Sequence, residues 1–362
     1  MSSKRLRDYG FTIGKLPTGQ LNCITDVPGV SVGQVTLHED RPDACVRTGV
    51  TAILPHPGDW FREKTVAAAH VINGFGKTTG LIQVDELGVI ESPIMLTNTF
   101  GVPAVTEGTL RYMLEQDDGI GDRDGSLNVV TGECNDSLLN DMRGLHVRPE
   151  HAMEAIRQGR EAMGTRRRVS EGAVGAGTGM VCFGYKGGIG TSSRQVEVDG
   201  VVYHFGVLVL TNFGNGEDLT ILGKPVGESL RAKPEEARDN DGSIIIVVGT
   251  DLPMDARQLK RIAKRAGFGL ARTGSIAHHG SGDIVIAFSN GNRIPHTSAS
   301  GTLELRVVRE DGRLISECFR AVAEATEEAI YNSLFMAETT MGREGRTIAA
   351  LPVEEVLALL GR

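Results

Sequence analysis

Short apolar runs separated by glycine and proline dominate the chain and predict a protein rich in β-strands. The run SIIIVV at residues 243–248 has no alternating polar positions, which predicts a strand buried on both faces. Glycine-rich turns and apolar strands alternate across 174–214. The other predicted strands and their turns cover 24–35, 48–54, 127–130, 283–288 and 303–308.

Apolar residues also recur at helical spacing in four places. The clearest, PEHAMEAIRQGREAM at 149–163, begins with proline in its first turn. In another, Asp255 is the expected N-cap and Gly267 the expected end. The predicted helices cover 108–115, 149–163, 255–267 and 316–338.

The order of these elements is too irregular for a repeated βαβ protein, and we find no internal repeat. It favours a layered α+β domain that spans residues 1–362. The polar stretch 223–241 carries many charges and few aromatic or β-branched residues. We therefore expect an exposed loop or linker there.

Charge and composition exclude several classes of partner. Thirty-eight basic and 46 acidic residues give a net charge of −8, without a basic stretch that could neutralise phosphates, so no nucleic-acid partner is expected. No run approaches the about 20 apolar residues that cross a bilayer, and the N-terminus lacks the apolar region of a secretory signal. Five scattered cysteines without a CxxC pair are typical of a reducing cytoplasm. The histidines form no zinc pattern, so we expect no metal or other cofactor.

The junction Asp241-Gly242-Ser243 allows two interpretations. Asp-Gly is common in hairpin turns, so the junction could be an ordinary turn. Alternatively, it is an internal cleavage site, because scission of the Gly242–Ser243 bond would give Ser243 both a hydroxyl nucleophile and a free α-amine. Such an amine has an ordinary pKa of about 7.7–8.0 and can act as general base for its own hydroxyl. Glycine at 242 would also permit a strained backbone.

Three further polar clusters adjoin predicted strands. In GSGD at 280–283, Ser281 and Asp283 could orient the Ser243 hydroxyl and amine by hydrogen bonds. Asn212 follows an apolar run and could donate to an oxyanion, an effect of about 3 kcal/mol in known enzymes. In GECND, Glu133 could pair with a substrate ammonium. Considered alone, each cluster is also explained by a polar turn.

Other motifs fail. GFGKT at 74–78 lacks the first glycine of a phosphate loop, which would fall at Val71. GAGTG at 175–179 lacks the GxGxxG spacing of a dinucleotide site, and no GxSxG nucleophile elbow is present. Cys134 has no evident histidine partner and is a weak candidate for a nucleophile.

In combination, these segments resemble the DmpA-like family of self-processing aminopeptidases, peptidase family S58, which includes L-aminopeptidase/D-esterases and β-aminopeptidases. The resemblance covers nearly the whole chain. It implies a four-layer αββα sandwich similar to N-terminal nucleophile hydrolases and self-cleavage into chains 1–242 and 243–362. It also implies a homotetramer of processed pairs. The matching segments are LNCITDVPGVSVGQVTL, TGVTAILPH, GECNDSLLNDM, GAVGAGTGMVCFGYKGGIGTSSR, LTNFG, DGSIIIVVGTD, RTGSIAHHGSGDIVIAFS and AETTMGREGRTIAALP.

The resemblance also assigns roles. Ser243 matches the new N-terminal nucleophile, Asn212 the oxyanion-stabilising asparagine and Ser281 the supporting serine. Asp283 stands where some members have glutamate, which is one methylene longer. Glu133 matches an acid that holds the substrate's amino group, and Asn135 stands where some members have a tyrosine. The implied substrate is a small peptide or an amino-acid amide or ester.

Two other functions stay open at this point. An acyltransferase of the ornithine-acetyltransferase type would use a related fold with an amine as acyl acceptor, but its self-exposed nucleophile is threonine, whereas position 243 is serine. A non-catalytic small-molecule-binding protein would remain uncleaved and would bind phosphate through the GKT and GAGTG segments.

Overall fold

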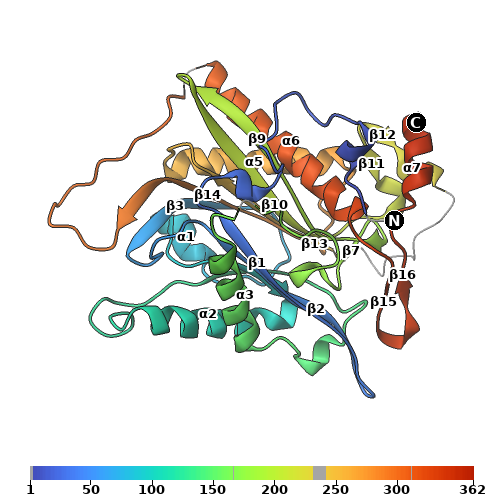
Figure 1. Ribbon diagram of the computed structural model, residues 1–362, viewed down its shortest axis with the longest axis horizontal. Helices are drawn as coiled ribbons and strands as arrows, with labels where there is room; N and C mark the ends of the chain where they lie inside the picture. Colours follow the sequence, from blue (N-terminus) through green and yellow to red (C-terminus); the bar gives the residue numbers. More distant parts are fainter. Residues whose placement is uncertain (1–2, 166, 231–241, 311) are drawn as a thin grey trace.

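Two β-sheets stack face to face, and helices cover the outer face of each sheet (Figure 1). The resulting order of layers is helix, sheet, sheet, helix, so the predicted α+β class with four αββα layers is confirmed. The structure is a computed structural model that describes residues 3–165, 167–230, 242–310 and 312–362.

The larger sheet has six strands in the order β4-β3-β14-β13-β10-β9. Neighbouring strands are antiparallel except β13 and β14, which are parallel. Helices α5 and α6 pack on its outer face. The bounds of these elements are β3 Glu63–Gly74, β4 Val89–Ile90, β9 Gly188–Val198, β10 Val201–Asn212, β13 Ser243–Thr250, β14 Gly282–Pro295, α5 Ala256–Arg272 and α6 Arg313–Phe335.

The smaller sheet has four strands in the order β1-β2-β5-β6, with α2 and α3 on its outer face. Strands β5 and β6 are parallel. These elements are β1 Ser31–Asp40, β2 Cys45–Leu54, β5 Ile94–Asn98, β6 Val130–Cys134, α2 Val102–Gln116 and α3 Pro149–Ala162. The remaining strands and α-helices are short: α1 Leu81–Leu87, β7 Val181–Cys182, β8 Tyr185–Lys186, β11 Thr220–Ile221, β12 Lys224–Pro225, α4 Val226–Ser229, β15 Thr340–Met341, β16 Thr347–Ile348 and α7 Val353–Leu360.

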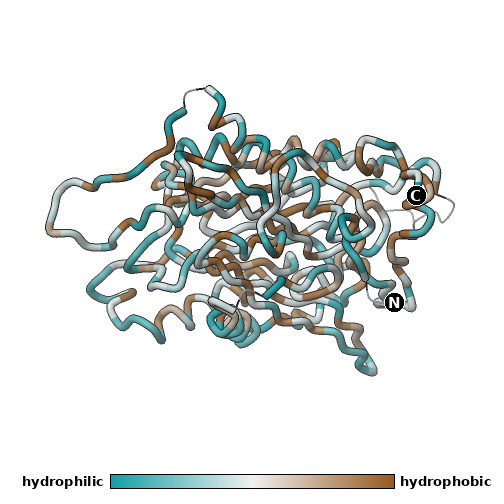
Figure 2. The backbone as a smooth tube through the Cα atoms, turned by 45° about the horizontal axis from the view of Figure 1, so that its top comes forward, coloured by the Kyte–Doolittle hydropathy of each residue, from teal (hydrophilic) through white to brown (hydrophobic). Residues whose placement is uncertain are grey.

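Strand β13 lies at the centre of the core. Ile244, Ile246 and Val248 pack toward α5 and α6, whereas Ile245 and Val247 pack into the layer between the two sheets. All eight residues of the strand are buried, which confirms the prediction made from its uninterrupted apolar run. Hydrophobic segments accordingly concentrate in the middle of the molecule in Figure 2.

Some predicted boundaries are wrong. Asp255 does cap α5, since its side chain accepts a hydrogen bond from the N–H of Gln258 at 2.6 Å, but the helix passes Gly267 and ends at Arg272. The expected strand 127–130 is instead β6 at Val130–Cys134. The expected strand at 303–308 has no strand partner among the described residues; it belongs to the extended loop at the left of Figure 1. The expected linker 223–241 includes β12 and α4, and its residues 231–241 lie outside the described part.

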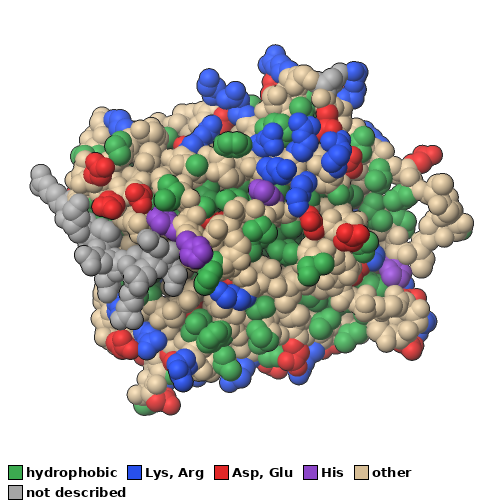
Figure 3. All heavy atoms as spheres, turned by 180° about the vertical axis from the view of Figure 1, so that it is seen from behind, with side chains coloured by type: hydrophobic (Ala, Val, Ile, Leu, Met, Phe, Trp, Pro, Cys, Tyr) green, Lys and Arg blue, Asp and Glu red, His purple; other side chains and the backbone are tan. Residues whose placement is uncertain are grey.

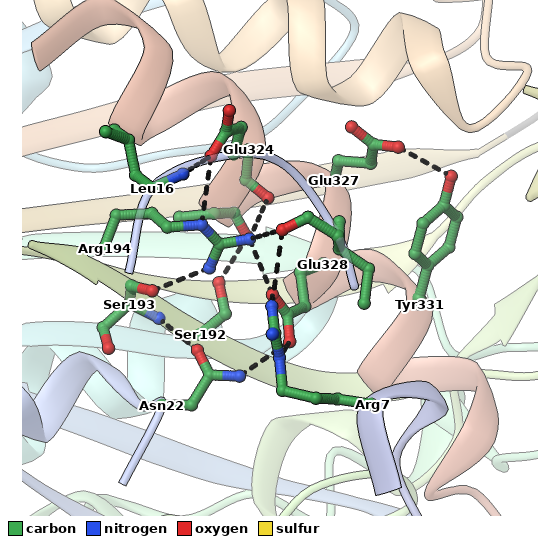
Figure 4. Close-up of polar contacts among 12 residues, drawn as sticks. Arg7, Leu16, Asn22, Ser192, Ser193, Arg194, Glu324, Glu327, Glu328 and Tyr331 are labelled. Carbon is green, nitrogen blue, oxygen red and sulfur yellow. Dashed lines mark hydrogen bonds and ion pairs between the residues drawn. The ribbon is translucent and has the colours of Figure 1, made fainter. Parts of the chain in front are cut away.

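A buried ion cluster fixes the N-terminal segment to the larger sheet (Figure 4). Arg194 of β9 is paired with Glu328 of α6 at 2.6 Å, and Arg7 donates to the same carboxylate at 2.8 Å. Burial alone would raise the pKa of Glu328, but the hydrogen bond from Arg7 and the charge of Arg194 outweigh it and hold the pKa below its usual value. The cluster is therefore ionised and links three segments that are distant in the sequence.

Lysine and arginine side chains gather on the outer surface over α5 (Figure 3). Several are paired with acids, because Arg257 and Arg261 both contact Glu310, and Lys260 contacts Asp85. Among the described residues, every helix is too short or too polar to span a lipid bilayer.

Candidate active site

A cavity of about 300 Å³ opens at the end of the larger sheet where β10 stops and β13 starts. Four of the residues singled out in the sequence line it: Asn135, Asn212, Gly242 and Ser281. These residues are up to about 150 positions apart in the chain, so the fold has brought separate motifs to one place.

Ser243 begins β13 at the edge of this cavity and is 5% exposed. It pairs with Asn212 across the antiparallel ladder and with Gly282 across the parallel one. Its hydroxyl donates to the carbonyl oxygen of Gly242 at 2.6 Å. The backbone N–H of Gly282 faces both the Ser243 Oγ, at 3.2 Å, and the Gly242 oxygen, at 3.1 Å. The hydroxyl therefore lies against the carbonyl of the peptide bond that precedes it, with an N–H donor beside that carbonyl.

Gly242 is required by packing rather than by backbone strain. Its φ is not in the left-handed region, contrary to the expectation of a strained conformation at this position. A Cβ added at Gly242 would instead lie 2.8 Å from the Cα of Phe213. Only glycine allows the chain to pass this close to the end of β10.

Asn212 is the last residue of β10, and its side-chain orientation is fixed. Its Oδ1 accepts a hydrogen bond from the backbone N–H of Val181 at 2.9 Å. Because a backbone N–H can only donate, the oxygen must face Val181, and the Nδ2 group is turned away from it. Opposite residues of an antiparallel pair share one face of the sheet, so this donor lies on the same face as Ser243.

Ser281 and Asp283 interact with each other. The Ser281 hydroxyl donates to Asp283 Oδ1 at 2.6 Å, and both residues are buried. Within the described residues, the Asp283 Oδ2 is buried without a hydrogen-bond partner. Burial raises the pKa of Asp283 to about 6, although the bond from Ser281 opposes this shift. The structure does not show the expected bonds to Ser243, whose hydroxyl is engaged by Gly242.

The two predicted substrate-binding residues lie in different surroundings. Asn135 is exposed and lines the cavity, and its Oδ1 accepts from the N–H of Ser137 at 2.9 Å. Glu133 is not among the lining residues. It is buried on β6, where the N–H of Lys77 donates to one carboxylate oxygen at 2.8 Å and the Thr99 hydroxyl donates to the other.

Sequence reasoning missed several contributors to the site. The Val181 N–H orients Asn212, and the Asn73 amide donates to the carbonyl oxygens of His278, at 3.0 Å, and Ser281, at 2.5 Å. His278 lines the cavity together with Asn215. The sequence carries no signal for these contacts, because backbone groups and loop carbonyls make them.

The described residues support neither a cysteine nucleophile at Cys134 nor a metal site. Burial raises the pKa of the Cys134 thiol well above its usual value, so this cysteine does not provide a thiolate nucleophile. Among the described residues, no group of three or more histidine, cysteine or acidic side chains could hold a metal ion.

Comparisons with known proteins show the family to which the chain belongs. The model of peptidase family S58 matches residues 22–348. The beta-peptidyl aminopeptidase BapA of Sphingosinicella microcystinivorans is 41% identical over 375 residues, which cover 98% of this chain and 91% of that protein.

Solved structures give the same result. The PH0078 protein of Pyrococcus horikoshii OT3 matches with a TM-score of 0.92 and 49% identity, covering 99% of this chain and 100% of that one. The L-aminopeptidase D-Ala-esterase/amidase of Ochrobactrum anthropi, a variant of the Ntn hydrolase fold, matches with a TM-score of 0.88 and 35% identity, covering 98% of each chain. The chain therefore belongs to peptidase family S58 and is a hydrolase that acts on peptide bonds.

Proposed function

We propose that this protein is a self-processing serine aminopeptidase. In this proposal the chain cuts its own Gly242–Ser243 bond, and the products 1–242 and 243–362 stay associated. The observation that carries the proposal is the 2.6 Å contact between the Ser243 hydroxyl and the carbonyl oxygen of Gly242, with the Gly282 N–H beside both oxygens. A nucleophile at the head of a fully buried strand is held rigidly, as attack on a carbonyl requires.

Self-cleavage follows from this arrangement in two steps. The Ser243 oxygen attacks the carbonyl carbon of Gly242, and the negative charge on the Gly242 oxygen is stabilised by the Gly282 N–H, already 3.1 Å away. The C–N bond breaks, the nitrogen takes the proton lost by the hydroxyl, and an ester joins the two parts. Water then hydrolyses the ester, which releases the Gly242 carboxylate and restores the hydroxyl.

The mature site uses the same atoms for external substrates. The new α-amine of Ser243 accepts the hydroxyl proton as the oxygen attacks the substrate's carbonyl, and Asn212 Nδ2 donates to the oxyanion. The amine or alcohol of the substrate leaves with that proton, and the acyl group remains on Ser243 as an ester. Water then attacks the acyl-enzyme through a second oxyanion. Ser281 and Asp283 act as a relay of hydrogen bonds that supports the new amine.

The substrates we propose are small peptides and amino-acid amides or esters with a free amino group. The carboxylate of Glu133 supplies the charge that would pair with the substrate ammonium, and Asn135 lines the cavity that would receive the residue. Glu133 lies near Gly282, the residue that pairs with Ser243, because Gly76 is close to both. A Cβ added at Gly76 would lie 3.8 Å from Glu133 Oε1 and 3.5 Å from the Cα of Gly282. Relatives named as β-peptidyl aminopeptidase and L-aminopeptidase D-Ala-esterase/amidase support this substrate class.

The proposal extends to the protein's state in the cell. We place the enzyme in the cytoplasm as a homotetramer of processed pairs that needs no cofactor. All five cysteines are free thiols in the structure, which supports a reducing compartment. The acyltransferase and the non-catalytic binding protein are disfavoured, because the peptidase family model covers residues 22–348.

One experiment tests the function directly. The intact mass of the purified protein, measured under denaturing conditions, should show two chains that end at Gly242 and begin at Ser243. The same sample should release p-nitroaniline from amino-acid p-nitroanilides and should lose this activity when the substrate's amino group is acetylated. A preparation that stays full-length and still hydrolyses these substrates would contradict the proposal.

The raised pKa of Asp283 predicts an acid limit to the reaction. Below its pKa of about 6 the carboxyl is protonated and no longer accepts freely from Ser281, so the rate should fall about tenfold per pH unit. Folding raises this pKa above its ordinary 3.8, so the group favours the folded state most at acidic pH and less as pH rises through about 6. The loss of rate between pH 6 and pH 4 should therefore not arise from unfolding caused by this group.

A pH–rate profile beside thermal melts at each pH measures this effect. Asp283→Asn should lower the rate and remove the part of the acid limb whose midpoint is about 6, whereas the part due to protonation of the Ser243 α-amine, with an ordinary pKa of about 7.7–8.0, should remain. If Asp283→Asn kept the part with its midpoint at about 6, another group would be responsible for it.

A further inference from the structure

The glycine-rich segment GAGTG at 175–179, which the mechanism above does not use, encloses a buried cation. The Lys186 side chain is completely buried, and its Nζ donates to the carbonyl oxygens of Met180 (2.7 Å), Gly187 (2.8 Å) and Gly177 (3.1 Å). Three acceptors match the three hydrogens of an ammonium group. Burial lowers the pKa of Lys186 to about 7, and the interactions with Cys182 and Asp136 oppose that shift. The three carbonyl acceptors favour the ammonium form.

The glycines let this segment pack tightly around the ammonium. A Cβ added at Gly177 would lie 2.5 Å from the backbone nitrogen of Ile189, and one at Gly179 would lie 2.2 Å from the carbonyl oxygen of Arg47. The segment is therefore wedged between β9 and β2. Its glycines serve a close backbone approach within the protein rather than a phosphate group.

The ammonium is connected to the oxyanion donor through a single peptide unit. The Met180 carbonyl that Lys186 holds and the Val181 N–H that holds Asn212 Oδ1 belong to the same planar peptide. In a trans peptide these two groups point in opposite directions, so fixing the oxygen also fixes the N–H. A hydrogen bond from a charged donor to the carbonyl also polarises the peptide and strengthens the N–H as a donor.

We propose that Lys186 is a positioning residue for Asn212: its ammonium holds the Met180–Val181 peptide so that the Asn212 Nδ2 faces the reacting carbonyl. Without that anchor only the N–H of Gly187, at 3.2 Å, still donates to the Met180 oxygen. The peptide plane is then held less firmly, and the hydrogen bond that fixes the Asn212 amide in one orientation is weakened. This inference rests on the proposed function, because it needs Asn212 to act on the oxyanion.

A double-mutant cycle on the processed enzyme tests the proposal. Lys186→Met should lower kcat about 10–100-fold with little change in KM, since a misplaced oxyanion donor weakens the transition state and not substrate binding. In an Asn212→Ala background, the same substitution should change kcat less than about twofold, because its target is gone. A merely structural lysine would lower kcat by a similar factor in both backgrounds, and that result would overturn the proposal.

Arg5→Met is the matched control. Arg5 is also buried and holds two backbone carbonyl oxygens, those of Leu21 (3.3 Å) and Asn22 (2.8 Å), and no peptide links it to Asn212. The Arg5→Met variant should have a lower melting temperature, but its kcat should not fall as expected for Lys186→Met.

Chemical rescue covers the case in which Lys186→Met does not fold or mature. Lys186→Ala leaves space for n-propylammonium, which replaces the lost methylenes and the charge and should restore kcat in a saturable way; neutral n-propanol should not. If neither compound restores processing or activity, Lys186 only fills the core and the proposal is wrong. If Asn212→Ala alone leaves kcat unchanged, the proposed role of Asn212 fails as well. If Asn212→Ala is impaired while the Lys186 effect persists in that background, only the present inference fails.

Discussion

Ser243→Ala should leave a folded, full-length protein without peptidase activity. The substitution removes the oxygen that lies 2.6 Å from the Gly242 carbonyl oxygen, so neither the internal bond nor a substrate carbonyl can be attacked. Hydrolysis should fall by about 10⁴-fold or more, as when the nucleophile of a serine hydrolase is deleted. The fold should persist, because only one hydroxyl at the edge of the cavity is lost. Denaturing mass measurement and p-nitroaniline release from the same sample provide the two readouts.

Ser275→Ala is the control for this prediction. Ser275 lines the same cavity, and its hydroxyl accepts only a local hydrogen bond from the N–H of Ala277, at 3.2 Å, among the described contacts. This variant should split and hydrolyse substrates like the unchanged protein. A Ser243→Ala chain that still divided at Gly242 would show that another group performs the cleavage and would refute the assignment.

The sequence predicted a helix or strand correctly where one strong local signal was present. The apolar run at 243–248 predicted a doubly buried strand, and the proline at the start of 149–163 predicted a helix that is present as α3. Gly267 was wrongly predicted to end α5. A Cβ at that position would meet nothing closer than 3.5 Å, so packing does not require glycine there. The helix continues through it because packing of the helix's apolar face outweighs the weak helix propensity of one glycine. At Gly269, two residues later, a Cβ would lie 2.4 Å from the carbonyl oxygen of Ala323, so glycine there lets α5 approach α6.

The predicted strand at 303–308 shows the limit of local pattern. Leu303, Leu305 and Val307 alternate as in a strand, but their exposed fractions are 49%, 40% and 50%. A strand needs a neighbour to satisfy its backbone groups, and the described chain supplies none here. Alternation alone does not reveal whether a partner exists.

The types of residue in the candidate site could be predicted from the sequence, but the groups that hold these residues in position could not. Ser243 begins β13, Asn212 ends β10 and Ser281 immediately precedes β14, so the position of each at the end of an apolar run could be inferred. The role of the peptide unit between Met180 and Val181 could not be inferred, because it depends on how a glycine-rich turn packs against Lys186. Glu133 was predicted to adjoin a strand that ends at residue 130, whereas it lies within β6, and both of its carboxylate oxygens accept hydrogen bonds.

Asn212→Asp should inactivate the processed enzyme almost as completely as loss of the nucleophile. Aspartate has the same shape and still accepts from the Val181 N–H, now 2.9 Å from Oδ1. It replaces the NH₂ donor by a second oxygen, which carries negative charge and faces the developing oxyanion. Removal of one oxyanion donor costs about 10²–10³-fold in kcat, and the added repulsion should increase that loss, with a smaller effect on KM.

The rate should be measured per processed chain, so that incomplete maturation is not counted as lost turnover. Asn215→Asp is the matched control, since it introduces the same charge into the same cavity, beside His278, at a position that the mechanism does not use. It should lower kcat less than about tenfold, because a charge that does not contact the oxyanion acts on it only across the cavity. Equal losses in the two variants would mean that negative charge in the cavity, and not the missing donor, stops the reaction. A fully active Asn212→Asp enzyme would remove Asn212 from the mechanism and leave the Gly282 N–H, which already faces the Ser243 oxygen at 3.2 Å, as the donor to be tested next.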